Sequence, residues 1–300
     1  CQEGQIECAR LLVEAGAAVN QAADGGVTPL FIACERGQLE CVRILLEAGA
    51  AVSQARNDGS TPLHMACLKG HLECAQLLLE ASAATDQAAQ DGATPLFIAC
   101  QSGRLECAQL LLEAGAAIEQ PVDDGPTPLS VASFAGAAVN QADAEGFTPL
   151  YVACQEGHLE CAQLLLEASA SVGQADKDGV TPLLIACQEG RLECAKLLRD
   201  AGAGINQAMN DGTTPLFIAC QQGHGECARL LLEAGAAVNQ ARQDGATPLY
   251  MACQNNHPEI ARLLRGAGAD INQAAEHGAT PLCIACQEGH LEVAALLLEA

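Results

Sequence analysis

The stretch TPLHMACLKGHLECAQLLLEASAATDQAAQDGA, residues 61–93, decides the fold, because near copies of it fill the chain. Its opening tripeptide begins at Thr28, Thr61, Thr94, Thr127, Thr148, Thr181, Thr214, Thr247 and Thr280. Seven of the eight steps between these positions are 33 residues long and one is 21. A fixed period of this size is typical of repeat arrays. Motifs that recur with this period are therefore interpreted first as parts of one repeated structural unit.

Each unit carries the signals of two helices. Thr61 is suited to cap a first helix, and Pro62 fits its first turn. Gly70 can end this helix because glycine tolerates a positive φ. Residues 71–81 predict a second, longer helix whose polar residues form one narrow stripe, while Leu, Ala and Cys cover the other sides. Such a helix must be buried on most sides. One unit cannot do this alone, but copies stacked on both flanks can.

These features resemble the ankyrin repeat family. The segment TPLHMA (61–66) matches the family signature T-P-L-H-x-A, and the 33-residue period, the Gly-His pair and the LLLEAGA run also match over essentially the whole chain. The resemblance implies an all-α solenoid of helix-turn-helix units joined by β-hairpin-like fingers. It also implies a non-catalytic scaffold that binds a protein partner through its concave finger and first-helix face.

The main departure from the family signature is at its fourth position, where only His64 keeps the histidine. The family's usual local hydrogen bond from this residue is therefore lost in most units. We expect apolar contacts between repeats to take its place. The replacements are Phe31, Phe97, Ser130, Tyr151, Leu184, Phe217, Tyr250 and Cys283.

The period divides residues 1–300 into a single array of about ten units. We expect a partial unit at 1–23, three full units over 24–126, a truncated unit at 127–141, and five units over 142–300 with the last one cut. The truncated unit is twelve residues short and lacks its second helix. Either the chain has a spatial break at 136/137, or the deletion is real and leaves a kink or cavity. Neither end has the polar face of a capping unit, so we expect missing termini and a segment of a longer array.

Composition narrows the class of partner and the compartment. With 14 basic and 37 acidic residues, a formal charge of −23, the chain is unsuited to nucleic acid or anionic lipid. A basic protein partner is compatible, although the charge also serves solubility. No apolar stretch approaches the length of a membrane span. The 17 cysteines are too few for a disulfide scaffold of this length, which indicates a reducing, cytoplasmic or otherwise intracellular compartment.

The cysteines fall in two columns, after the first-helix Ile-Ala or its equivalent and in the second-helix Glu-Cys pair, and we interpret most of them as core filling. Disulfide or redox roles stay open. The pair His71/Cys74 supplies only half of a zinc site, and Gln38, Arg104 and Arg191 replace the histidine elsewhere. We therefore predict no metal, no cofactor and no enzyme activity. Local hydrogen bonds at the start of the second helix are expected for His71, His158, His224, His257 and His290.

Comparison among the units places the variable residues in the fingers, on either side of a turn that is often Asp-Gly. Exposed, variable residues on a rigid frame suit recognition, whereas neutral drift at solvated tips is the alternative. The predicted protein-binding residues are Arg56, Asn57, Ser60, Gln90, Asp143, Phe147, Asp176, Lys177, Met209, Asn210, Thr213, Arg242 and Gln243. Near identity of the units also allows a second hypothesis, a structural solenoid that packs on itself or on other subunits.

Overall fold

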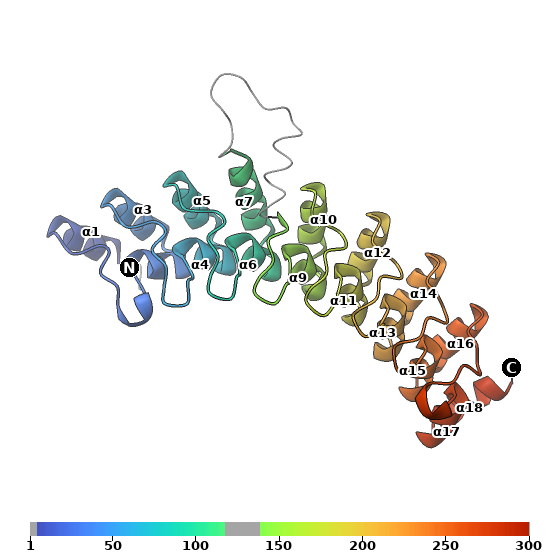
Figure 1. Cartoon of the computed structure of the whole chain (residues 1–300). Helices are drawn as coiled ribbons and strands as arrows, with labels where there is room; N and C mark the ends of the chain where they lie inside the picture. The colour runs from blue at the N-terminus through green and yellow to red at the C-terminus, as the bar shows by residue number, and fades with distance from the viewer. Residues whose placement is uncertain (1–4, 118–138, 300) are drawn as a thin grey trace, which may run out of the picture. The chain divides into compact units, whose positions relative to one another are not determined.

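The computed structural model describes residues 5–117 and 139–299, and in this part of the chain it has seventeen α-helices and no strand. An all-α repeat fold is thereby confirmed. The contacts divide the chain into two compact units, one of residues 1–153 with 160–171 and one of residues 154–159 with 172–300. Each unit is a row of helix pairs (Figure 1).

In the N-terminal unit, first helices contact first helices and second helices contact second helices. The pairs α2 with α4 and α4 with α6 are in contact, as are α3 with α5 and α5 with α7. In chain order the elements are α1 (Ile6–Glu14), the 3₁₀ turn η1 (Asp24–Gly26), α2 (Pro29–Glu35), α3 (Leu39–Glu47), α4 (Pro62–Lys69), α5 (Leu72–Glu80), α6 (Pro95–Gln101) and α7 (Leu105–Ala117). They are followed by α9 (Pro149–Glu156), whose last residues are assigned to the other unit, and α10 (Leu159–Glu167).

The C-terminal unit repeats this arrangement, with α13 between α11 and α15 and with α14 between α12 and α16. Its elements are α11 (Pro182–Gln188), α12 (Leu192–Asp200), α13 (Pro215–Gln222), α14 (Gly225–Glu233), α15 (Pro248–Gln254), α16 (Pro258–Gly266), η2 (Glu276–Gly278), α17 (Pro281–Gln287) and α18 (Leu291–Leu298).

The threonine of the signature caps the first helix as predicted. In α13, the Thr214 hydroxyl accepts a hydrogen bond from the Phe217 backbone N–H at 3.2 Å, and Pro215 occupies the first turn. Thr214 is only 1% exposed. Since a proline has no N–H to lose and a buried hydroxyl satisfies an orphan donor, this tripeptide starts the first helix of each described repeat at a defined residue.

The core is made of small and medium apolar side chains. Ala66, Cys67 and Leu78 are all 0% exposed, and the same positions are buried in the other internal repeats that the structure describes. Alanine and cysteine at the facing positions let the helices approach closely, which explains why a chain without tryptophan can bury its helices.

A finger is defined here as the five residues that precede each capping threonine, for example residues 56–60. The expected hairpins are turns rather than strands in the described residues. In this finger the Arg56 N–H donates to the Ser60 carbonyl at 2.9 Å and the Gly59 N–H donates to Arg56 at 3.0 Å. Five residues are too few for a regular two-stranded ladder.

Fingers of consecutive repeats are joined edge to edge. The N–H of the second finger residue donates to the carbonyl of the third residue in the preceding finger, as from Gln90 to Asp58 at 2.9 Å. The Ala144 N–H makes the same bond to Asp91 at 2.7 Å. The repeat that begins at Thr148 is therefore the direct neighbour of the repeat that begins at Thr94. The junction at 136/137 and most of the truncated unit 127–141 lie outside the described residues.

A candidate protein-binding surface in the fingers

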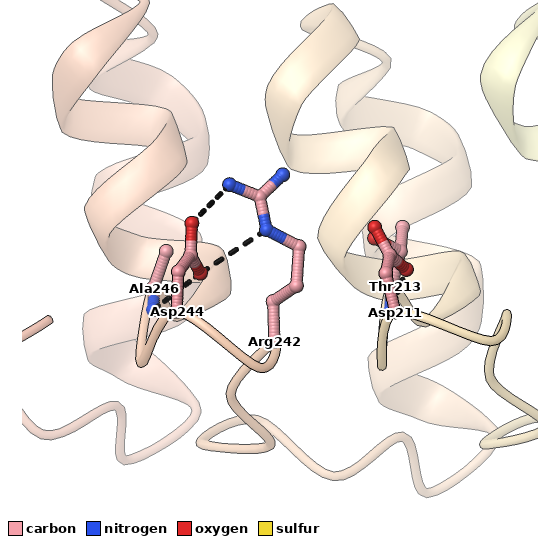
Figure 2. A network of polar contacts seen from close by, with 5 residues as sticks. All are labelled: Asp211, Thr213, Arg242, Asp244 and Ala246. Carbon is pink, nitrogen blue, oxygen red and sulfur yellow. Dashed lines mark hydrogen bonds and ion pairs between the residues drawn. The ribbon is translucent and has the colours of Figure 1, made fainter. Parts of the chain in front are cut away.

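The first finger position is partly buried in each described finger after the one at residues 23–27, and its arginines pack on the preceding repeat. The guanidinium carbon of Arg242 lies 5.0 Å from the centre of the Phe217 ring, and that of Arg56 lies 5.3 Å from Phe31. Figure 2 shows Arg242 also bound to the carboxylate of Asp244 in its own finger. Arg56 pairs with Asp58 in the same way, at 3.0 Å. These arginines are held by ring and carboxylate together.

The same contacts set the acidity of the finger carboxylates. The hydrogen bond from Arg242 lowers the pKa of Asp244, outweighing partial burial, and the Ala246 N–H adds a second bond at 3.1 Å (Figure 2). For Asp58, burial opposes ionisation, but hydrogen bonds from Ser60 and the nearby Arg56 outweigh it and lower the pKa. Both carboxylates are therefore stabilised as anions inside the finger.

The other residues at the first position also serve the turn. One carboxylate oxygen of Asp143 accepts the N–H groups of Glu145 and Phe147, each at 2.9 Å. Asp176 does the same for Asp178 and Val180. Met209 is partly buried. Much of the variation at this position therefore has a structural explanation.

The fifth finger position is likewise covered. Thr213 is 4% exposed, and its N–H donates to the carboxylate of Asp211 at 2.8 Å (Figure 2). Ser60 and Phe147 are partly buried, and the Phe147 ring stacks on Tyr151 with centres 4.6 Å apart. This position contributes little exposed surface.

In every finger that the structure describes, the second position is exposed. It is occupied by Asp24, Asn57, Gln90, Ala144, Lys177, Asn210, Gln243 and Glu276. Several amide side chains here reinforce the joined fingers, since Gln90 Nε2 donates to the Asn57 carbonyl at 2.6 Å and Gln243 Nε2 to that of Asn210 at 2.8 Å. The structure thus separates the predicted residues into one exposed group and two packed groups.

The histidines that open the second helices bond to the preceding repeat, so the prediction of local bonds is wrong where the structure shows their partners. His224 Nε2 bonds to the Gln188 carbonyl and His290 Nε2 to that of Gln254, each at 3.0 Å. His257 follows the same pattern. Arg191 Nε takes this role toward Gln155 at 3.0 Å. The residue before the second helix is His in some repeats and Arg in others, and each of these side chains has an N–H group that can donate. This substitution pattern is the sequence signal for the contact.

At the signature position His64 has a local and a distant partner. Its Nδ1 accepts from the Thr61 N–H at 3.1 Å, and its Nε2 lies 3.1 Å from the Ala93 carbonyl in the next finger. Phe217 makes apolar contact with Met251 and Ala246 of the next repeat instead. Both side chains join the first helix to the following finger.

Within residues 5–117 and 139–299, no group of three or more His, Cys, Asp or Glu side chains is placed to hold a metal ion. Among the helices of residues 5–117 and 139–299, none combines the length and the hydropathy that a membrane crossing requires.

Comparison with known protein families places the repeats in a described family. The family model described as "Ankyrin repeats (3 copies)" matches residues 1–89, 50–123, 82–140, 129–209, 201–275 and 241–300. No curated protein matches the chain. The matched ranges span the whole chain, and the structure shows capped helix pairs joined by fingers at the 33-residue period. The chain therefore belongs to the ankyrin repeat family.

Proposed function

We propose that this chain is a non-catalytic scaffold that binds a protein partner through the exposed second finger positions. Ankyrin repeat proteins are in general protein-protein interaction modules. The observation that supports this assignment is the combination of a hydrogen-bonded finger backbone with exposed, variable side chains at that one position. A surface whose backbone is already ordered loses little conformational entropy on binding.

The charge balance favours a basic partner, since the chain carries a formal −23. We propose neither a nucleic-acid partner nor insertion into a membrane. We also assign the chain to a reducing, intracellular compartment, because its cysteines are too few for a disulfide scaffold of this length and most of them fill buried core positions.

The test is capture of a protein by the whole chain, followed by matched amide substitutions on two faces. The finger variant is Asn57→Ala with Gln90→Ala. The control variant is Gln76→Ala with Gln109→Ala, at exposed positions of α5 and α7. We expect the finger variant to weaken binding about tenfold and the control to leave it unchanged.

A captured protein that tolerates the finger variant but is lost with the control would overturn the proposal. A parallel pair in the C-terminal unit, Lys177→Ala with Gln243→Ala, shows whether that row of fingers also takes part. Circular dichroism of each variant confirms that the helices are retained.

Self-association into a structural solenoid is the competing proposal. Among the described residues, the large apolar side chains with high exposure are Ile6, Leu11 and Leu12 on α1 and Leu291 and Leu298 on α18. Apolar surface of this kind favours contact with another chain. Sedimentation of the whole chain that shows a monomer across micromolar concentrations would remove this alternative, and assembly lost on Leu12→Glu would support it.

A further inference from the structure

The finger at residues 23–27 places its aspartate one position earlier than the other fingers do. The chain has seven Asp-Gly pairs, and in six of them the aspartate is the third finger residue and the glycine the fourth. In the remaining pair Asp24 is the second residue and Gly25 the third. The pair at 124–125 lies outside the described residues.

An aspartate and glycine at the third and fourth positions are held by two hydrogen bonds. The Gly59 N–H donates to the Arg56 carbonyl at 3.0 Å, and the Asp58 carboxylate accepts the Ser60 N–H at 2.9 Å. The same two bonds are present at residues 91–92, 211–212 and 244–245. The pair at 178–179 keeps the first of these bonds, at 3.2 Å. The turn therefore engages the glycine nitrogen and, in most fingers, the aspartate carboxylate as well.

The earlier pair escapes both bonds. In its finger the turn bond runs from the Gly26 N–H to the Ala23 carbonyl at 3.1 Å, so the nitrogen of Gly25 is not the one that is held. Both Asp24 and Gly25 are exposed. Within residues 5–117 and 139–299, no group donates a hydrogen bond to the Asp24 carboxylate. A carboxyl group and the amide nitrogen next to it are thus left accessible to each other and to water.

This arrangement suits a reaction within the backbone. The amide nitrogen that follows an aspartate can attack the side-chain carboxyl carbon and close a cyclic imide. A glycine at the following position favours this closure, since it has no Cβ to obstruct the approach and its backbone is the most adaptable. A Cβ built on Gly25 would meet nothing within 4 Å, so the surrounding structure leaves room for the ring.

We propose that Asp24 is a site of spontaneous modification, at which the bond between Asp24 and Gly25 becomes an isoaspartyl bond. The Gly25 nitrogen loses its proton and attacks Cγ of Asp24, and the carboxyl oxygen leaves as water, which gives a succinimide. Water then adds to the backbone carbonyl carbon of the ring, and the bond from that carbon to the nitrogen breaks. One water is released and one is consumed, so the mass is unchanged and nothing is oxidised or reduced.

The consequence falls on the contact between the first two described fingers. The Asn57 N–H donates to the Gly25 carbonyl at 2.9 Å. An isoaspartyl bond inserts one further backbone carbon before Gly25 and leaves the former main-chain carboxylate as a side group. Space nearby is limited, because a Cβ on Gly26 would lie 2.8 Å from Asn57 Oδ1. The modification should therefore weaken this bond between fingers. It does not depend on the proposed protein partner.

The test is peptide mapping of the whole chain after prolonged incubation at neutral pH, with a second sample incubated in urea. The isomers have equal mass and are distinguished by chromatography and electron-transfer fragmentation. In the native chain we expect isoaspartate to form at Asp24 about tenfold faster than at Asp58, Asp91, Asp211 and Asp244, where two bonds must first open. In urea the rates should become similar. Hydrogen exchange at the Asn57 amide should rise as the modification accumulates.

A change of position within the finger provides the sharpest variant. Asp24→Gln with Gly25→Asp gives this finger the order Ala-Gln-Asp-Gly found at residues 89–92, so an Asp-Gly pair remains but lies at the third and fourth positions. Its modification should fall to the rate of the other fingers. The control Asp24→Glu keeps the charge but would need a larger ring, and it should abolish the product. Circular dichroism checks that both variants stay folded.

The proposal is wrong if Asp24 is modified no faster than Asp58 and Asp91 in the native chain. It is equally wrong if the difference persists in urea, or if the variant with the moved pair keeps the fast rate. Either result would mean that the hydrogen bonds of the finger do not decide which aspartate reacts. Because the readout is a covalent product, failure to capture a protein partner leaves this test unaffected.

Discussion

Replacing Gly190 by alanine tests whether consecutive repeats are joined by the histidine that opens the second helix. Gly190 follows α11 with φ of +66°, and a Cβ added there would lie 2.6 Å from two atoms of the His224 ring. The ring is held in that place by the bond from Nε2 to the Gln188 carbonyl, at 3.0 Å. The methyl group and the histidine therefore cannot both occupy their native positions.

The expected cost has two parts. A left-handed backbone costs a residue with a Cβ about 1–2 kcal/mol relative to glycine. Displacing His224 adds about 1 kcal/mol for the lost hydrogen bond. Gly190→Ala should therefore lower the free energy of unfolding by about 2–3 kcal/mol. Gly235 also has positive φ, at +84°, but an added Cβ would meet nothing within 4 Å. Gly235→Ala should therefore cost only about 1–2 kcal/mol.

The assay is urea unfolding followed by circular dichroism, for a double-mutant cycle of Gly190→Ala with His224→Ala. Once the imidazole is absent, the added methyl group has room, so Gly190→Ala should then cost no more than Gly235→Ala. The coupling between the two substitutions should be about 1 kcal/mol.

Equal costs for Gly190→Ala and Gly235→Ala, together with additive effects in the cycle, would show that the histidine contact contributes nothing. The interpretation of His224, and by extension of His257 and His290, as contacts between repeats would then fail.

Three further predictions concern the helix cap at Thr214, the ion pair of Asp244 and the segment 118–138 between the repeats that begin at Thr94 and Thr148. Thr214→Ala removes the acceptor for the Phe217 N–H and should cost about 1–2 kcal/mol in thermal or urea unfolding, whereas Thr214→Ser should restore most of it. Because the pKa of Asp244 is lower in the folded state, its stabilisation is present above the unfolded pKa of about 3.9 and is lost as pH falls through the folded value. The stability difference between the native chain and Asp244→Asn should therefore shrink below about pH 4, as checked by urea unfolding at several pH values. Deletion of residues 118–138 joins LLEAGAA to VNQ and restores the 33-residue period between Thr94 and Thr148, whose repeats are already neighbours through Ala144 and Asp91. The unfolding free energy of this deletion variant should stay within about 1 kcal/mol of the native value or rise. A loss of several kcal/mol would contradict the conclusion that the repeats beginning at Thr94 and Thr148 are neighbours.

Local features of the fold follow from the sequence because they depend on residues close together in the chain. Thr214 and Pro215 fix where α13 begins, and Gly223 with φ of +84° lies where it ends. Leucine, alanine and cysteine at helical spacing indicate which faces must be buried. The variable finger positions were also visible in the sequence, but not which of them are exposed.

Contacts between repeats were decided only by the tertiary structure. Arg242 is a variable finger residue in the sequence, yet its position depends on the ring of Phe217 in the preceding repeat. The bond from the Ala144 N–H to the Asp91 carbonyl depends on which units stack and in which register. A pattern with one period is compatible with several registers of stacking, and only the packed array selects one of them.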